Sequence, residues 1–110
     1  MGQILIRSIV RPEKSQEVID ALLEAGYTAV TKVGVAGRGR QRGLKVGEVL
    51  YDELPKEMLM TVVPEQERDM VLRTVMASAR TGESGNYGDG KIFISPVEQV
   101  YTISSGFLEE

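Results

Sequence analysis

QILIRSIVRPE at residues 3–13 and MLMTVVPE at residues 58–65 are the two stretches that decide the fold. Each is a run of β-branched and apolar residues that ends at a Pro-Glu pair and leads into an amphipathic pattern. Such a run predicts a β-strand, and a proline followed by an apolar stripe predicts a helix. The repeated order indicates two similar halves within one chain.

Each predicted helix carries one apolar stripe. The stripe consists of Val18, Ile19, Leu22, Leu23 and Ala25 in the first helix and of Met70, Val71, Val75, Met76 and Ala79 in the second. Gly26 should end the first helix. Further strands are expected over residues 28–35 and 91–94, and the last strand should be followed by a strand-like tail over residues 97–103.

Two βαβ halves predict an α+β fold of the ferredoxin-like type, in which the halves interleave into a four-stranded antiparallel sheet with both helices on one face. The other face of the sheet stays bare. If Leu, Ile and Val side chains lie on it, the chain should form an oligomer, because a monomer would expose a large apolar patch. A polar second face, and hence an isolated domain, is the alternative that periodicity leaves open.

The composition excludes several classes of protein. The 110 residues suffice for one domain, residues 1–110. Without cysteine or histidine, the chain lacks disulfides, thiolate nucleophiles, imidazole bases and the usual transition-metal ligands, so no catalytic residue is expected. A net charge of −3 argues against general nucleic-acid binding. No apolar run approaches the roughly 20 residues of a membrane helix and no signal-peptide pattern is present, which favours the cytoplasm and no membrane insertion.

Two glycine-rich interruptions carry the candidate binding residues. Residues 36–55 form a connection longer than the roughly 12–15 residues usual in compact domains, which is typical of a functional loop. Its GRGRQRG run at residues 37–43 alternates glycine with long cationic or amide side chains, a pattern suited to an anion. The alternatives are a solvated loop and an RNA-binding arginine-glycine segment.

The second interruption, GNYGDGK at residues 85–91, nearly matches a Walker A loop. Ile92 stands where Ser or Thr should hold magnesium, and residues 92–94 look like a strand, whereas a P-loop opens a helix. A P-loop NTPase is therefore excluded. A glycine turn with backbone N–H groups and Lys91 beside them can still bind phosphate, although a plain β-turn has the same signature.

Taken in order, these motifs resemble the PII family of nitrogen-regulatory signalling proteins over nearly the whole chain. GRQRG at residues 39–43 and LPK at residues 54–56 look like the ends of the family's T-loop, while ARTG at residues 79–82 and GDGKIFI at residues 88–94 look like its B-loop and the adjoining strand. The resemblance gives a T-loop at about residues 37–55, a B-loop at about 81–90 and a C-terminal loop at about 97–106. It implies a trimer with a long T-loop.

The resemblance also implies ligands. ATP or ADP would lie between subunits, Mg²⁺ would bridge ATP, Gln41 and 2-oxoglutarate, and Lys56 would pair with a 2-oxoglutarate carboxylate. The implied nucleotide contacts are Thr31 from a neighbouring subunit, Gly37, Arg40, Gln41, Val62, Gly88, Asp89, Gly90 and Lys91. The T-loop, including Arg42 and Tyr51, would bind the target protein.

Three runs are similar to the NifI branch of this family. They are RPEK at residues 11–14, YDELPKEML at residues 51–59 and PVEQVYTI at residues 96–103. That branch regulates nitrogenase by binding its dinitrogenase component, and its members occur as two unlike paralogues that assemble together. This chain resembles the first of the pair, which implies a homotrimer or a mixed oligomer with a paralogous PII-like subunit.

The sequence departs from the common PII pattern in several places. The T-loop is several residues shorter, and Val49 aligns with the tyrosine that is usually uridylylated. Thr102 and Ser104 replace two basic residues of the C-terminal loop, and residues 84–87 are an insertion in the B-loop. Control by uridylylation is therefore not expected, while nucleotide preference and 2-oxoglutarate binding stay open.

Three other functions fit parts of the sequence. The nearest is a PII protein that regulates an ammonium transporter, against which the short T-loop and Val49 weigh. A small nucleotide-hydrolysing enzyme would need a positioned base or a metal-activated water, and the chain has no histidine. A ferredoxin-like RNA binder would need aromatic side chains and positive charge on its sheet, but aromatic residues are 5% and the net charge is negative.

Overall fold

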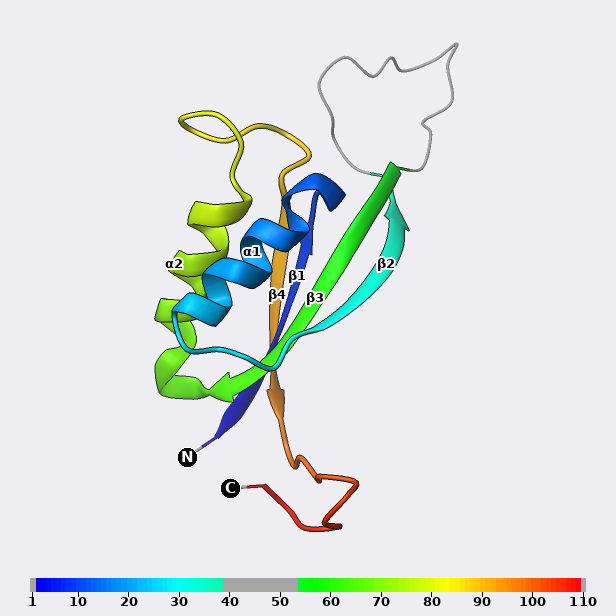
Figure 1. Cartoon of the computed structure of the whole chain (residues 1–110), viewed down its shortest axis with the longest axis vertical. Coiled ribbons are helices and arrows are strands. Elements are labelled where there is room, and N and C mark those ends of the chain that lie inside the picture. The colour runs from blue at the N-terminus through cyan, green and yellow to red at the C-terminus, as the bar shows by residue number, and fades with distance from the viewer. Residues whose placement is uncertain (1, 39–53, 110) are drawn as a thin grey trace.

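The computed structural model of the chain describes residues 2–38 and 54–109 (Figure 1). In these residues the order strand, helix, strand occurs twice, as the repeated sequence pattern predicts. The elements are β1 (Gln3–Val10), α1 (Pro12–Glu24), β2 (Thr31–Gly37), β3 (Leu54–Pro64), the 3-10 turn η1 (Glu65–Glu67), α2 (Arg68–Ala79) and β4 (Gly90–Val97). The predicted double βαβ fold is confirmed.

The four strands of the described residues pair antiparallel in the order β2-β3-β1-β4. In the centre, Ile6 of β1 lies opposite Thr61 of β3 and Ile94 of β4. Figure 1 shows α1 and α2 packed together on the same face of this sheet. Two interleaved βαβ halves produce this arrangement, so both the sheet and the placement of the helices agree with the prediction.

The hydrophobic core lies between the helices and the sheet. Alternate residues of β1 and β3 point toward the helices, and residues three or four apart on each helix contact them in return. The buried apolar side chains are Ile4, Ile6, Val10, Val18, Leu22, Leu59, Val63, Val71, Val75 and Ala79. Tyr27 packs against this core and donates its hydroxyl to Glu67 Oε1 at 2.7 Å, which ties the segment after α1 to η1.

The apolar stripe predicted on the first helix is correct at its centre and wrong at its margin. Val18 and Leu22 of α1 are buried, and Ile19 packs against the core. Leu23 is 55% exposed, because a residue next to Leu22 is turned about 100° around the helix axis and leaves the contact face. Ala25 lies beyond the helix as its C-cap and is exposed.

The stripe predicted on the second helix is also too wide. Val71, Val75 and Ala79 lie four residues apart and are buried, whereas Met70 and Met76 are each 46% exposed. Met76 borders a cavity of about 480 Å³ between α2, β1 and β4. Because β4 is the edge of the sheet, the outer side of α2 has no further strand to cover it.

The face of the sheet away from the helices is largely apolar. Leu5 lies beside Val62 on this face and Ile9 beside Met58, while Phe93 of β4 is 51% exposed. No helix of the described residues covers it (Figure 1). The expectation of an apolar second face is therefore confirmed, and the alternative of a polar one is wrong.

The limits of the edge strands differ from the predictions. The second strand was expected over residues 28–35, but β2 is Thr31–Gly37, because the residues after α1 are used in crossing from the helix to the sheet edge. The last strand was expected over residues 91–94, but β4 is Gly90–Val97 and pairs with β1 along its whole length. Because β1 continues beside it, β4 extends beyond the apolar residues from which the strand was predicted.

The C-terminal tail is not the strand predicted over residues 97–103. After β4 the chain turns back on itself, so that Tyr101 bridges Leu108 and the Thr102 N–H donates to the Phe107 carbonyl at 3.1 Å. Gly106 has a φ of +74°, a conformation that favours glycine. The alternating apolar residues of this tail predict a strand, but alternation alone does not show that a partner strand is present.

Ser15 in α1 allows a test of how much a buried hydroxyl group without a hydrogen-bond partner costs in stability. Its side chain is buried, and its Oγ has no hydrogen-bond partner in the described residues. We expect Ser15→Ala to raise the free energy of unfolding by roughly 0.5–1 kcal/mol, because a buried unpaired hydroxyl is costly and alanine is the better helix former. Urea unfolding followed by circular dichroism measures the change.

Ser78→Ala in α2 is the matched control for Ser15→Ala. Ser78 Oγ donates to the Thr74 carbonyl at 2.7 Å, so the same substitution removes a hydrogen bond and should give no gain in stability. Equal gains at both serines would show that helix propensity alone, and not the unpaired hydroxyl, accounts for the effect.

Candidate functional site

A cavity of about 510 Å³ opens where β2 ends and β3 begins, beside residues 81–89 (the 81–89 turn), which precede β4. The end of β2 contributes Gly37 and the following Arg38, and β3 contributes Lys56. The 81–89 turn and the start of β4 supply the opposite wall. Segments that are far apart in the sequence therefore meet at one end of the sheet (Figure 1).

Most binding residues predicted from the sequence and present in the described residues line this one cavity. They are Gly37, Lys56, Gly88, Asp89, Gly90 and Lys91. Thr31 and Val62 do not line it, because they lie further along the uncovered sheet face, where Thr31 pairs with Met60 and Val62 with Leu5. The other predicted residues lie outside the described residues: Arg40, Gln41, Arg42 and Tyr51.

The side chains around the cavity carry an excess of positive charge. Arg38, Lys56 and Lys91 line it, and Asp89 is the single carboxylate among its described lining residues. The chain as a whole has a net charge of −3. A local positive site on a negatively charged protein attracts an anion specifically to that site, because the surrounding surface repels it.

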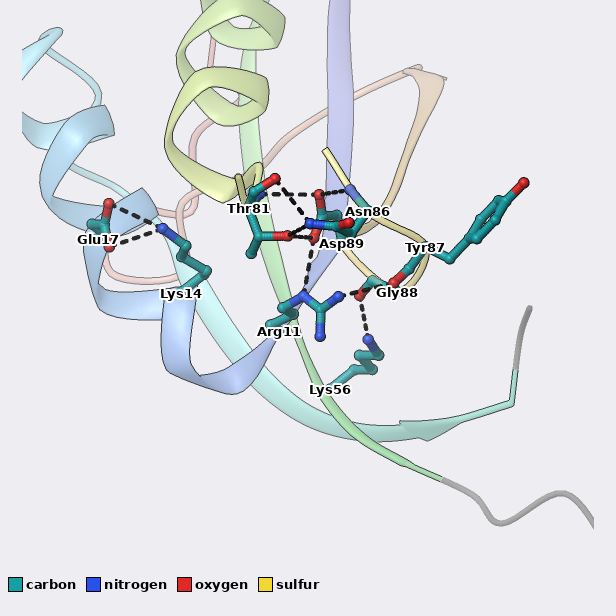
Figure 2. A network of polar contacts seen from close by, with 9 residues as sticks. All are labelled: Arg11, Lys14, Glu17, Lys56, Thr81, Asn86, Tyr87, Gly88 and Asp89. Atoms are coloured by element: carbon teal, nitrogen blue, oxygen red, sulfur yellow. Dashed lines mark hydrogen bonds and ion pairs between the residues drawn. The ribbon is translucent and has the colours of Figure 1, made fainter. Parts of the chain in front are cut away.

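The Asp89 carboxylate holds the 81–89 turn together from within (Figure 2). Its Oδ1 accepts hydrogen bonds from Thr81 Oγ1 at 2.6 Å and from Arg11 Nε at 3.0 Å. Its Oδ2 accepts the backbone N–H groups of Thr81 at 3.0 Å and Asn86 at 2.9 Å. Four donors fill the acceptor capacity of a carboxylate, so Asp89 orders the turn that borders the cavity.

These contacts determine the ionisation of Asp89. Burial by itself raises the pKa of its carboxyl group, but the hydrogen bonds from the Thr81 hydroxyl, from the Asn86 and Thr81 backbone N–H groups and from Arg11 outweigh burial. The net effect holds the pKa of Asp89 well below its ordinary value. Asp89 is therefore ionised at neutral pH, and its negative charge is stabilised by hydrogen-bond donors of the turn and by Arg11.

Arg11 supports the turn beside the cavity, a role that the sequence does not reveal. Its Nε donates to Asp89, and its Nη2 donates to the Tyr87 carbonyl at 2.9 Å (Figure 2). In the sequence, Arg11 stands out only as part of the RPEK run at residues 11–14. No local signal could have shown the contact, because its two partners lie 76 and 78 residues along the chain.

Lys56 makes a second contact to the same turn. Its ammonium group donates to the Gly88 carbonyl (Figure 2). Burial, followed by the positive charge of Arg11, lowers the pKa of Lys56. Lys56 is thus an ammonium group in a partly desolvated position, where the pairing with an anionic ligand would be stronger than in open solvent.

Glycine is required at the border between the 81–89 turn and β4. Gly88 has a φ of +96° and Gly90 a φ of +122°, values that residues with a Cβ rarely adopt. A Cβ on Gly90 would also stand 1.8 Å from the Ile9 carbonyl oxygen. Gly90 begins a strand and not a helix, which confirms that the turn is not a P-loop.

The geometry of the described residues supports binding of an anion. In residues 2–38 and 54–109 no three acidic side chains gather into a metal site. The full sequence contains no histidine and no cysteine. Within the same described residues, no helix is long and apolar enough to cross a bilayer.

Comparisons with known proteins agree with this fold. The family model "Nitrogen regulatory protein P-II" matches residues 3–106. The "Nitrogen fixation nifHD region GlnB-like protein 1" of Methanobacterium ivanovii is 52% identical over 99 residues, which are 90% of this chain and 91% of that protein. The "Nitrogen fixation nifHD2 region GlnB-like protein 1" of Methanosarcina barkeri is 50% identical over 102 residues, 93% of this chain and 94% of that protein. The crystal structure of Arabidopsis thaliana PII bound to citrate has a TM-score of 0.80 at 32% identity and covers 99% of this chain and 87% of that chain.

The fold, the basic cavity and these relatives together define a small regulatory protein and not an enzyme. The chain belongs to the P-II family of nitrogen regulatory proteins. Its identity of about half with the nifHD-region relatives over most of both chains confirms the resemblance to the nitrogen-fixation branch that the sequence motifs indicated.

Proposed function

We propose that this protein senses cellular energy and nitrogen status by binding ATP or ADP together with Mg²⁺ and 2-oxoglutarate, and that it controls nitrogenase through direct contact of its T-loop. The observation that carries the proposal is the basic cavity at one end of the sheet, which brings Lys56 and Lys91 beside an ordered glycine turn. The nifHD-region relatives support a target in nitrogen fixation.

The nucleotide phosphates occupy this cavity in the proposal. Lys91 supplies charge, and the backbone of Gly88 and Gly90 lets an anion approach closely because no Cβ stands in the way. Asp89 contributes by fixing the turn, since its carboxylate already accepts four hydrogen bonds. Gly37 borders the same cavity, and Arg40 and Gln41, which lie outside the described residues, are proposed as further phosphate contacts.

The resemblance implies that Thr31 reaches the nucleotide from a neighbouring subunit, and the position of Val62 leads us to infer the same for Val62. Val62 lies six residues along β3 from Lys56, about 20 Å at the rise of a strand. Both residues lie on the uncovered apolar face of the sheet, which an oligomer would cover. A trimer, or a mixed oligomer with a paralogous subunit, would place these residues beside a neighbour's cavity.

In the proposal, 2-oxoglutarate binds next to the phosphates. One of its carboxylates replaces the Gly88 carbonyl as the hydrogen-bond acceptor of Lys56. The Lys56 ammonium group is held by the neutral Gly88 carbonyl, and a carboxylate is the stronger acceptor. Mg²⁺ would be held by Gln41, ATP and 2-oxoglutarate. The Arabidopsis relative, solved with citrate, supports a carboxylate ligand. Effector binding needs only to favour one T-loop conformation over another to act as a switch in the cytoplasm.

Titration calorimetry with Mg²⁺–ATP and then with 2-oxoglutarate tests the proposal, on protein whose mass in solution has been measured. We expect a trimer-sized particle, saturable ATP binding, and 2-oxoglutarate binding that ATP enhances. We expect Lys56→Met to weaken 2-oxoglutarate binding roughly 10- to 100-fold, because a desolvated charged hydrogen bond is lost, and to leave most of the ATP affinity.

Lys32→Met is the control for Lys56→Met. Lys32 lies on β2 and pairs only loosely with Glu57, at 3.9 Å, so its loss changes the net charge equally without touching the cavity. Equal weakening by both substitutions would contradict a carboxylate site at Lys56. If neither ligand binds to the wild-type protein, alone or mixed with the paralogous subunit, the sensor function is wrong.

A further inference from the structure

We propose that Arg11 is a positioning residue for the phosphate site: it fixes the direction of the Tyr87–Gly88 peptide so that the Gly88 N–H, and not a carbonyl oxygen, is available to an anion. The inference rests on the proposed nucleotide site. Arg11 itself does not line the cavity, so it acts through the 81–89 turn.

The Arg11 guanidinium group forms hydrogen bonds to two parts of the turn at once. Nε donates to the Asp89 carboxylate at 3.0 Å, and Nη2 donates to the Tyr87 carbonyl at 2.9 Å. The guanidinium is planar and its donors are fixed relative to each other, so the two contacts also fix the Tyr87 carbonyl relative to Asp89. A lysine, with a single ammonium group, holds no such fixed pair of directions.

The direction of one carbonyl determines the direction of the next N–H. In a trans peptide the C=O and N–H groups point to opposite sides, and the described residues contain no cis peptide. Because the Tyr87 carbonyl points to Arg11, the Gly88 N–H points away from it. Lys56 holds the following carbonyl, that of Gly88, in the same manner. In the ligand-free protein both carbonyl oxygens thereby face cations, and the Tyr87 carbonyl stays with Arg11 when 2-oxoglutarate binds Lys56.

Glycine makes this restraint necessary. Gly88 has a φ of +96° and lacks the Cβ that would limit rotation of the peptide before it. Without Arg11 the Tyr87–Gly88 peptide can reverse and present its carbonyl oxygen where the N–H stood. An anion would then be repelled by the turn that should bind it.

The backbone conformation at Arg11 is restricted, which limits where its side chain can lie. Arg11 is the N-cap of α1, with φ −62° and ψ 141°, between the last residue of β1 and Pro12. A residue before proline is restricted to such extended conformations, and its side chain is only 18% exposed in the ion pair with Asp89. The Tyr87 carbonyl, which accepts a hydrogen bond from Arg11, belongs to residues 84–87, an insertion relative to the common PII pattern. Arg11 therefore stabilises the part of the turn that the insertion lengthens.

The test compares Arg11→Met, Arg11→Lys and the control Lys14→Met, which removes a charge of the same sign three residues away. Within the described residues, the Lys14 ammonium group bonds only to Glu17 (Figure 2). Hydrogen exchange of the Asn86 and Thr81 amides, which donate to Asp89, is followed by NMR on the ligand-free protein, and ATP affinity is measured by calorimetry.

For Arg11→Met we expect faster exchange at both amides and ATP affinity weaker by roughly 10- to 100-fold, the effect of losing a charged hydrogen-bond pair. Arg11→Lys should restore only part of the affinity, and Lys14→Met should match the wild type in both measurements. A merely structural role would leave Arg11→Met with ATP affinity equal to that of Lys14→Met.

Two results would overturn the inference. Normal ATP affinity in Arg11→Met would show that the turn does not need Arg11, and weakened affinity with unchanged amide exchange would show that Arg11 acts by its charge and not by positioning. If the wild-type protein binds no ATP, the proposed function fails. The exchange measurement on the free protein then still decides whether Arg11 holds the turn.

Discussion

Gly90→Ala should destabilise the protein by about 3–6 kcal/mol, the largest effect expected of a single methyl group in this chain. Two costs combine. A Cβ at this position would stand 1.8 Å from the Ile9 carbonyl oxygen and 2.9 Å from its carbonyl carbon, and both are backbone atoms that cannot rotate away. The φ of +122° adds strain for any residue with a side chain. Urea unfolding followed by circular dichroism measures the loss.

Two other glycines separate the clash from the strain. Gly26 has a φ of +102° but open space around its Cβ position, so Gly26→Ala should cost only the strain, about 1–2 kcal/mol. Gly34 lies in β2 with neither a positive φ nor an atom within 4 Å, and Gly34→Ala should change stability by less than about 1 kcal/mol. If Gly90→Ala costs no more than Gly26→Ala, β4 can shift away from β1 and the close approach at Gly90 is not required.

Asp89→Asn should lower the free energy of unfolding by about 2–4 kcal/mol. The substitution keeps the shape of the side chain but places an N–H₂ group where the carboxylate accepts four hydrogen bonds. It also leaves Arg11 without its ion-pair partner. Asp20→Asn is the matched control, because Asp20 is exposed on α1 and, within the part of the chain that the structure describes, accepts a single hydrogen bond, from Gln16. It should change stability by less than about 0.5 kcal/mol.

The effect of Asp89→Asn should depend on pH in a defined direction. The pKa of Asp89 in the folded protein is depressed, so its contribution to stability is present above the unfolded value of about 3.9 and is lost as the pH falls through the folded value. The difference in unfolding free energy between wild type and Asp89→Asn should narrow by about 1 kcal/mol between pH 7 and pH 3. Urea midpoints at the two pH values test this, and a difference that stays constant would contradict the role of the charge.

The sequence predicted the architecture well because the fold repeats a local pattern. The runs at residues 3–13 and 58–65 each specify a strand followed by a helix, and two such units have few ways to interleave. The errors lie where tertiary partners decide the outcome. Leu23 and Met76 carry apolar side chains at helical spacing but lie beside the contact line, and the alternating tail at residues 97–103 lacks a partner strand.

The candidate site was predictable only in part, for a related reason. Gly88, Gly90 and Lys91 form a contiguous motif, and the structure places them with Lys56 around one cavity. Arg11 was missed because its role follows from contacts to residues 76 and 78 positions away. The saturated carboxylate of Asp89 was missed as well, since a GDGK sequence does not reveal which donors surround the aspartate.

The long sequence separation between Arg11 and the 81–89 turn has a consequence for the order of folding. Contacts of this kind form late, because the chain must first close a large loop, and here that loop closes only when β4 has paired with β1. We therefore expect a chain in which β4 has not yet paired with β1 to lack an ordered 81–89 turn. If the proposed function is correct, such an incompletely folded subunit should bind no nucleotide and should not act on its target.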